Sequence, residues 1–182
     1  MAQLITDLVK FRDANRNDIR NANHNLIIGT TFSCWDLLHA GHNIFLEDSK
    51  KNCDILCVGL QTDPTINRPE KNKPIQSLAE REIQIKSCRY VDYYFIYDTE
   101  ESLYNSIKSL EPDIRFLGND YVGKKFTGDD LTNIKIYFHT RTVHNYSTTA
   151  LRRIIYEAEH KKIHSLMDKN SIFVKSKGQF YS

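Results

Sequence analysis

The sequence contains no apolar run long enough to cross a membrane. Its apolar runs, such as Ile-Leu-Cys-Val-Gly-Leu at residues 55–60, are short, whereas a spanning helix needs about 20 apolar residues. The first seven residues, Met-Ala-Gln-Leu-Ile-Thr-Asp, also lack the basic region and apolar core of a signal peptide. We therefore expect a cytoplasmic protein with no membrane partner.

Cysteine is scarce as well, and no excess of one charge is present. The four cysteines, Cys34, Cys53, Cys57 and Cys88, do not form paired Cys-x-x-Cys sites. We interpret them as reduced thiols, the last three of them packed, which is typical of the cytoplasm. The 25 basic and 23 acidic residues leave a net charge of +2, which is too balanced to indicate nucleic acid as the main partner.

The length suits one domain with short appendages. The chain has 182 residues, of which 40% are hydrophobic and 26% charged, as in ordinary globular proteins. Apolar residues at helical spacing near the start predict an N-terminal helical extension over 1–24. The main domain is expected over 25–164, and a C-terminal extension over 165–182.

Apolar strands alternate with helical patterns through the main domain. Strands are predicted over 26–32, 54–61, 92–97, 113–118 and 134–138, and helices over 41–51, 77–88, 100–110 and 147–166. Such alternation indicates an α/β fold, in which a parallel sheet carries helices on both faces. We expect a doubly wound sheet of five strands.

Two histidines separated by a glycine follow the first strand of this domain. His39, Gly41 and His42 stand where that strand turns into a helix. Backbone N–H groups and the helix dipole favour phosphate at such a turn, Gly41 leaves room for it, and both imidazoles can donate hydrogen bonds. Alternatives are histidines that satisfy only the turn itself, or a metal pair. No third ligand lies at a recognisable spacing, so no metal ligand is predicted.

A second segment offers similar chemistry near the C-terminal end of the domain. Ser147 and Thr148 begin the predicted long helix and can offer hydroxyls and N–H groups to an anion. Arg141 can present two parallel donors to phosphate oxygens. The simpler interpretation is that these hydroxyl residues only cap the helix.

Together these segments resemble a known family. His39-x-Gly41-His42, preceded by the aromatic–Asp pair at 35–36, resembles the signature of the nucleotidyltransferase superfamily with the HxGH motif. Within it the chain most resembles the glycerol-3-phosphate and choline-phosphate cytidylyltransferases. Three further segments carry the likeness: Arg-Tyr-Val-Asp at 89–92, Gly-Asn-Asp-Tyr at 118–121, and Arg-Thr followed by Ser-Thr-Thr within 141–149. The likeness covers about residues 25–160 and implies a Rossmann-like fold.

The resemblance implies transfer of CMP from CTP to a small phosphorylated alcohol, glycerol 3-phosphate by default, with release of pyrophosphate. It implies Mg²⁺ as cofactor and a homodimer. The catalytic residues would be His39, His42, Lys73 and Arg141. The nucleotide-binding residues would be Phe32, Ser33, Cys34, Trp35, Asp36, Gly41, Asp120, Thr142, Tyr146, Ser147 and Thr148. Arg89 and Asp63 would bind the acceptor.

The chain departs from the family pattern at two places. Where the family has Gly-Thr-Phe-Asp, residues 33–36 read Ser-Cys-Trp-Asp, so that a threonine is replaced by Cys34. One extra residue separates Thr142 from Ser147, and the family's glycine is missing. Two alternatives stay open. One is an adenylyltransferase acting on a sugar phosphate, whose relatives share the histidine motif and Ser-Thr-Thr but commonly lack Arg-Thr; the presence of Arg141-Thr142 favours CTP over this alternative. The other, motivated by Cys34 and the altered Arg141 loop, is a catalytically weak nucleotide-binding protein.

Several of these residues also have simpler interpretations. The lysine loop that carries Lys73 can be a solvated run of charge, and Asp120 can be a turn residue. Arg81, which matches the family's Glu-Arg pair, and Arg89 can be surface charges.

Overall fold

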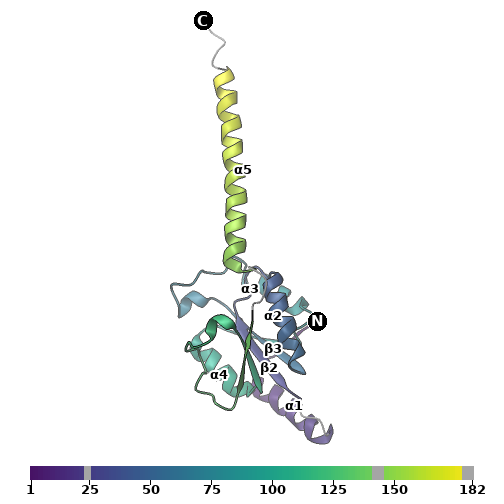
Figure 1. The fold of residues 1–182 in the computed structure, drawn as a ribbon. Coiled ribbons are helices and arrows are strands. Elements are labelled where there is room, and N and C mark those ends of the chain that lie inside the picture. The colour runs from purple at the N-terminus through teal and green to yellow at the C-terminus, as the bar shows by residue number, and fades with distance from the viewer. Residues whose placement is uncertain (23–25, 141–145, 178–182) are drawn as a thin grey trace. The chain divides into compact units, whose positions relative to one another are not determined.

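The computed structural model describes residues 1–22, 26–140 and 146–177 (Figure 1). Side chains are described outside 17–25, 141–145 and 168–182. The chain forms two compact units, Met1–His144 and Asn145–Ser182, which we describe separately.

The first unit is built on one parallel sheet. Its strands are β1 Gln3–Leu4, β2 Ile28–Ser33, β3 Ile55–Gln61, β4 Tyr93–Tyr97, β5 Ile114–Gly118 and β6 Lys135–His139, in the spatial order β1-β4-β3-β2-β5-β6. Every strand pair is parallel. The predicted α/β, doubly wound parallel sheet is confirmed.

The number of strands is six rather than five. The additional strand, β1, lies in the segment predicted as a helical extension, and it pairs with β4 through hydrogen bonds from Gln3 N to Asp92 O and from Ile5 N to Tyr94 O. A two-residue strand is too short to show alternation, and its partner lies about ninety residues away, so the local pattern did not reveal it.

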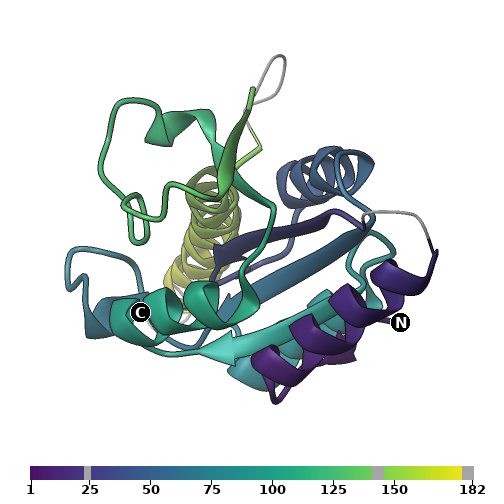
Figure 2. The ribbon, with the colours of Figure 1, turned by 90° about the horizontal axis from the view of Figure 1, so that it is seen from below.

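Helices cover both faces of the sheet. The helices are α1 Leu8–Ala22, α2 Ala40–Lys51, α3 Leu78–Ser87 and α4 Glu100–Leu110, with short 3₁₀ turns η1 Pro64–Ile66 and η2 Asn119–Tyr121. One core cluster joins α2 and α3 to the sheet through Leu46, Leu56 and Ile85, and the other joins α1 and α4 through side chains that include Cys57 and Ile107. Figure 2 shows α1 and α4 side by side on one face and α2 on the other.

The strand order indicates where on the sheet a ligand would bind. The chain leaves β2 towards β3 and β4 and then returns to β5, so the order reverses between β2 and β5. In open α/β sheets, ligands bind at the carboxyl ends of the strands beside such a reversal. The histidine turn directly follows β2 and therefore lies at this position.

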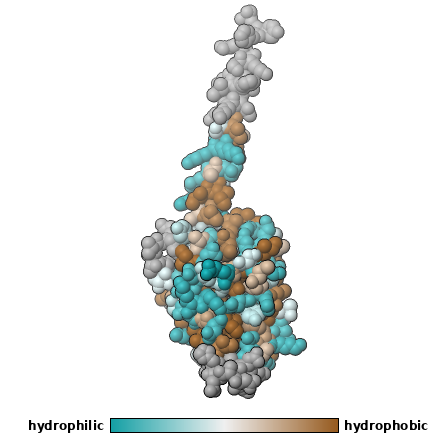
Figure 3. Space-filling model, turned by 90° about the vertical axis from the view of Figure 1, so that its right-hand side faces the viewer, coloured by the Kyte–Doolittle hydropathy of each residue, from teal (hydrophilic) through white to brown (hydrophobic). Residues whose placement is uncertain are grey.

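The second unit contains helix α5, Thr148–Lys177. Ser147 Oγ accepts a hydrogen bond from Ala150 N at 3.1 Å, as expected of a capping residue. Apolar side chains reach the surface along its described part, among them Ile154, Tyr156 and Met167 (Figure 3). Among the residues that the structure describes, no helix is both long enough and apolar enough to cross a bilayer.

Candidate active site

A strained turn links β2 to α2. Trp35 and Leu37 have φ angles of 50° and 49°, in the left-handed region that side-chain-bearing residues rarely occupy. Backbone strain of this kind persists only where the surroundings enforce it, and it gathers at functional sites. The turn therefore needs strong local anchors.

Trp35 and Asp36 supply those anchors. Trp35 is 1% exposed and donates from Nε1 to Gly59 O at 3.0 Å. Asp36 is 2% exposed, and its Oδ1 accepts from the main-chain nitrogens of Ile75 and Gln76, both at 3.0 Å. Both residues were predicted to bind nucleotide. The structure shows that their side chains hold the turn against β3 and the loop that precedes α3.

The two histidines form the N-terminal cap of α2. His39 Nδ1 accepts from Gly41 N at 3.1 Å, and His42 Nδ1 accepts from His39 N at 3.4 Å. Their rings stack with centroids 3.9 Å apart. A neutral imidazole that accepts at Nδ1 carries its proton on Nε2. The cap therefore fixes both rings as Nε2–H donors at a helix N-terminus, where an anion is stabilised.

Arg81 connects several main-chain segments beside the histidine turn, and the sequence did not reveal this role. This residue of α3 is 2% exposed, and burial lowers its pKa. It donates from Nε to Gln76 O, from Nη1 to Cys34 O and Gln61 O, and from Nη2 to Thr62 O, at 2.6–3.2 Å. One guanidinium thus joins the ends of β2 and β3. The interpretation of Arg81 as a surface charge is wrong. Its sequence neighbours Glu80 and Glu82 gave no signal of burial, because runs of charged residues are common on exposed helix faces.

Lys73 and Asp63 lie together at the edge of this region. Lys73 Nζ is 3.8 Å from Asp63 Oδ2, and the Lys73 side chain is 80% exposed. Hydrogen bonds from the Thr65 hydroxyl and main chain lower the pKa of Asp63, with a smaller contribution from Lys73. A predicted catalytic lysine and a predicted acceptor residue are therefore neighbours.

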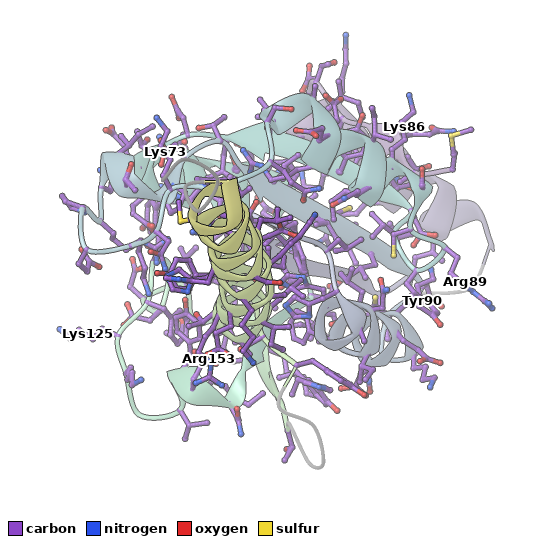
Figure 4. All side chains as sticks on the ribbon, turned by 90° about the horizontal axis from the view of Figure 1, so that it is seen from above. Lys73, Lys86, Arg89, Tyr90, Lys125 and Arg153 are labelled. Atoms are coloured by element: carbon purple, nitrogen blue, oxygen red, sulfur yellow. The ribbon has the colours of Figure 1, made fainter. Side chains whose placement is uncertain are left out.

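Two other predicted residues are placed at opposite edges of the sheet. Asp120 follows β5 at the carboxyl edge and is exposed, and Gly118 accommodates it because a Cβ there would lie 2.4 Å from Asp120 Oδ1. Arg89 precedes β4 at the amino edge, where its guanidinium lies 5.3 Å from the Tyr90 ring centre. Figure 4 shows Arg89 and Lys73 on opposite sides of the unit. The structure does not bring Arg89 to the histidines, and its acceptor role stays a prediction.

The remaining predicted residues belong to other parts of the chain. Arg141 and Thr142 lie outside the described residues. Tyr146, Ser147 and Thr148 belong to the second unit. Their roles in nucleotide binding stay predictions.

Neither the buried thiols nor a cluster of metal ligands adds to the chemistry of the described residues. Burial raises the pKa of Cys53 to about 12 and raises that of Cys57 still further, so both thiols are protonated at neutral pH. Among the described residues, no three His, Cys, Asp or Glu side chains are grouped to hold a metal ion. Mg²⁺ is normally bound through substrate phosphates and only one or two carboxylates. The carboxylates at this edge, such as Asp120, are compatible with that arrangement, and Mg²⁺ stays a prediction.

Comparison with known proteins defines the class. The family model described as cytidylyltransferase-like matches residues 30–167. The chain belongs to this family, and therefore to the nucleotidyltransferase superfamily.

Two similar proteins carry the same name, HldE. The bifunctional protein HldE of Wolinella succinogenes is 39% identical over 102 residues, which are 56% of this chain and 21% of that protein. HldE of Campylobacter curvus is 36% identical over 130 residues, or 71% of this chain and 27% of that protein. The chain thus spans about a fifth to a quarter of the length of these relatives.

Solved structures agree on the fold. A lipopolysaccharide core biosynthesis protein from Thermoplasma volcanium superposes with a TM-score of 0.53 and 26% identity, covering 66% of this chain and all of that one. Pantoate–β-alanine ligase from Francisella tularensis has the same TM-score of 0.53 at 17% identity, covering 80% of this chain and 69% of that one, and shares the fold alone.

These comparisons decide between the predictions only in part. Nucleotidyltransferase is confirmed as the class, and the Rossmann-like fold with it. CTP as donor, glycerol 3-phosphate as acceptor and the homodimer are not confirmed.

Proposed function

We propose that this protein transfers an adenylyl group from ATP to the phosphate of a sugar phosphate and releases pyrophosphate. The acceptor is supported by the relatives described above, one of which is named for lipopolysaccharide core biosynthesis. A lipopolysaccharide is assembled from sugars, and a nucleotidyltransferase that acts on a sugar phosphate makes an activated sugar.

The choice of ATP is supported by the relatives described above and by the segment where the chain departs from the cytidylyltransferase pattern. Arg141-Thr142 is retained, but the segment has an extra residue before Ser147 and no glycine. By the resemblance, this segment lies near the nucleotide. The histidine motif and Ser-Thr-Thr, which sugar-phosphate adenylyltransferases share, are both retained.

The observation that carries the proposal is the histidine cap of α2. A phosphate oxygen of the acceptor attacks the α-phosphorus of ATP, the bond from that phosphorus to the oxygen bridging to the β-phosphorus breaks, and pyrophosphate leaves. The Nε2–H groups of His39 and His42 donate to phosphate oxygens on which negative charge develops, and the α2 N-terminus adds its dipole. No covalent intermediate on the protein is needed.

Other residues contribute charge and position. Lys73, on its exposed loop beside Asp63, supplies a further cation for the phosphates. Arg141, Thr142, Ser147 and Thr148 are proposed to contact the nucleotide. Mg²⁺ would neutralise triphosphate charge. A homodimer, as the resemblance implies, is part of the proposal.

The test measures pyrophosphate release from ATP, CTP, GTP and UTP with magnesium. The acceptors are aldose 1-phosphates with five, six and seven carbons, together with glycerol 3-phosphate, choline phosphate and ethanolamine phosphate. Release that needs ATP and an aldose phosphate supports the proposal. Release from CTP with glycerol 3-phosphate would restore the cytidylyltransferase prediction. A nucleotide that raises the melting temperature without any release would instead indicate the weak nucleotide-binding protein.

A further inference from the structure

A second polar cluster lies on the α4 face at the carboxyl edge, and the catalytic residues do not account for it. We call it the α4-side network. It consists of Gln61, Arg68, Glu100, Arg115 and Thr127.

Contacts join these residues into one chain. Arg68 Nη2 donates to Gln61 Oε1 at 3.2 Å and lies 3.1 Å from Glu100 Oε1. The Thr127 hydroxyl donates to Glu100 Oε2, and Arg115 Nη1 donates to Thr127 O. Segments that follow β3, β4 and β5 are thereby tied together beside the histidine turn.

The network also holds buried polar atoms that make no hydrogen bond within the part of the chain that the structure describes. These atoms are Gln61 Nε2, Arg68 Nε, Glu100 Oε1 and Arg115 Nε. Gln61 is 2% exposed and Arg115 4% exposed. Glu100 Oε1 is ion-paired with Arg68, whereas the three nitrogens have no described hydrogen-bond partner. Buried polar groups are nearly always hydrogen-bonded, so these atoms need an explanation.

The position of the network connects it to the reaction. Gln61 O and Cys34 O accept from the same nitrogen, Arg81 Nη1, so the end of β3 adjoins the turn that carries the histidines. Gln61 is followed by Thr62 and Asp63, and Asp63 lies beside Lys73. A substrate held at the histidines can therefore extend to the α4 face.

The chemistry of the four atoms selects a class of ligand. Three are donors, and the fourth is a carboxylate oxygen that is ion-paired with Arg68 and has a second lone pair with which to accept. A hydroxyl group both donates and accepts, so a molecule with several hydroxyls can satisfy both kinds. The faces of the Arg115 guanidinium are covered by Phe32 and Phe126, whose ring centres lie 5.1 and 5.0 Å away, so hydrogen bonding is confined to its edge.

We propose that the α4-side network recognises the sugar hydroxyls of the acceptor. The inference rests on the proposed function, because it names the part of the site that would select a sugar phosphate. Gln61 and Glu100 are its specificity-determining residues. Their amide and carboxylate contact hydroxyls, while the acceptor phosphate lies towards Lys73 and the histidines.

The test compares the binding of glucose 1-phosphate, mannose 1-phosphate and their deoxy analogues by titration calorimetry. The variants are Gln61→Leu, which keeps the shape of the side chain, and Glu100→Gln, which keeps its size. Matched controls are Gln84→Leu on α3 and the exposed Glu101→Gln on α4. ATP binding and melting temperature are measured for every variant.

We expect both network variants to weaken binding of the preferred sugar phosphate by about tenfold or more, because a desolvated sugar hydroxyl loses its hydrogen-bond partner. ATP affinity should be unchanged, and the controls should match the wild type. A deoxy sugar phosphate that lacks the recognised hydroxyl should bind the wild type weakly. The network variant should bind this analogue with the same affinity as the wild type does.

The other possible results show whether this inference or the proposed function has failed. If the variants bind sugar phosphate as the wild type does, the inference is overturned even when adenylyl transfer is observed. A wild type that binds none of the sugar phosphates likewise overturns it. If the variants lose sugar phosphate binding but no pyrophosphate is released, the binding site stands and the proposed transfer fails.

Discussion

Two buried arginines, Arg81 and Arg115, lie on opposite faces of the sheet and are treated differently by their surroundings. Arg81 donates to four main-chain carbonyls. Arg115 has one described hydrogen bond to Thr127 O, two aromatic rings over its faces and an unpaired Nε. Burial lowers the pKa of Arg115 to about 10, which still leaves it charged at neutral pH.

This difference distinguishes a framework from a recognition site. A buried polar network whose members are all paired fixes one geometry, whereas unpaired members cost stability unless a ligand pairs them. The α2–α3 side, with Arg81, Trp35 and Asp36, holds the histidine turn. The α4 side holds the atoms that we assign to substrate.

The largest expected effect is on stability, from Arg81→Met. The change removes the donor from four carbonyls that are partly or fully buried, which should cost about 3 kcal/mol or more of unfolding free energy. Urea denaturation followed by circular dichroism measures it. Arg81→Lys serves as control, and its unfolding free energy should lie between those of the wild type and Arg81→Met. An Arg81→Met protein as stable as the wild type would show that Arg81 is no framework residue.

A change in the cap of α2 should affect turnover next. His42→Ala removes one donor to the developing charge, and we expect turnover to fall by about 10²-fold or more. It also opens the capping box, at a cost of about 1 kcal/mol in stability. Asn43→Ala, at the exposed neighbouring position, is the control. A folded His42→Ala enzyme with near-normal turnover would remove His42 from the proposed chemistry.

Arg115→Met sharpens the comparison because the same change is made on the other face. It loses one hydrogen bond and the cation–π contacts but also removes an unpaired buried Nε, so we expect about 1–2 kcal/mol of destabilisation. Thermal and urea unfolding should thus rank it well below Arg81→Met. Equal losses of unfolding free energy in Arg81→Met and Arg115→Met would contradict the distinction between a framework and a recognition site.

The smallest effect concerns the acids that cap α3 and α4. Hydrogen bonds from Ser77 lower the pKa of Glu80, and those from Ser102 and Thr99 lower that of Asp98. A lowered pKa adds stability that is present above the unfolded value and is lost as the pH falls through the folded value. The model-peptide values are 4.5 and 3.8. The melting temperature should therefore decrease as the pH is lowered past about 4.5. This decrease should be less steep in Glu80→Gln and Asp98→Asn. Parallel curves for wild type and variants would contradict this.

Local patterns in the sequence predicted most of the fold and the central part of the site. Five strands and the helices between them produce strong apolar periodicity, and His39, Gly41 and His42 lie in a turn whose chemistry is local. The strand β1 could not be predicted, because two residues gain their structure from a distant partner.

The roles of buried polar residues were harder to predict. Trp35 and Asp36 look like ligand contacts in a motif, yet they are buried anchors of the turn. A signal for the α4-side network was present, since Gln61 and Arg115 interrupt strands that are otherwise apolar, and charged residues are almost never fully buried unless paired. Which atoms remain unpaired depends on tertiary contacts that the sequence does not reveal.

One competition experiment distinguishes the proposed adenylyltransferase from a cytidylyltransferase. Equal concentrations of ATP and CTP are incubated with the protein, magnesium and a mixture of aldose 1-phosphates and glycerol 3-phosphate, and the nucleotide products are identified by mass spectrometry. The account predicts an ADP-sugar as the main product. A CDP-alcohol as the main product would contradict both the nucleotide and the acceptor that we propose.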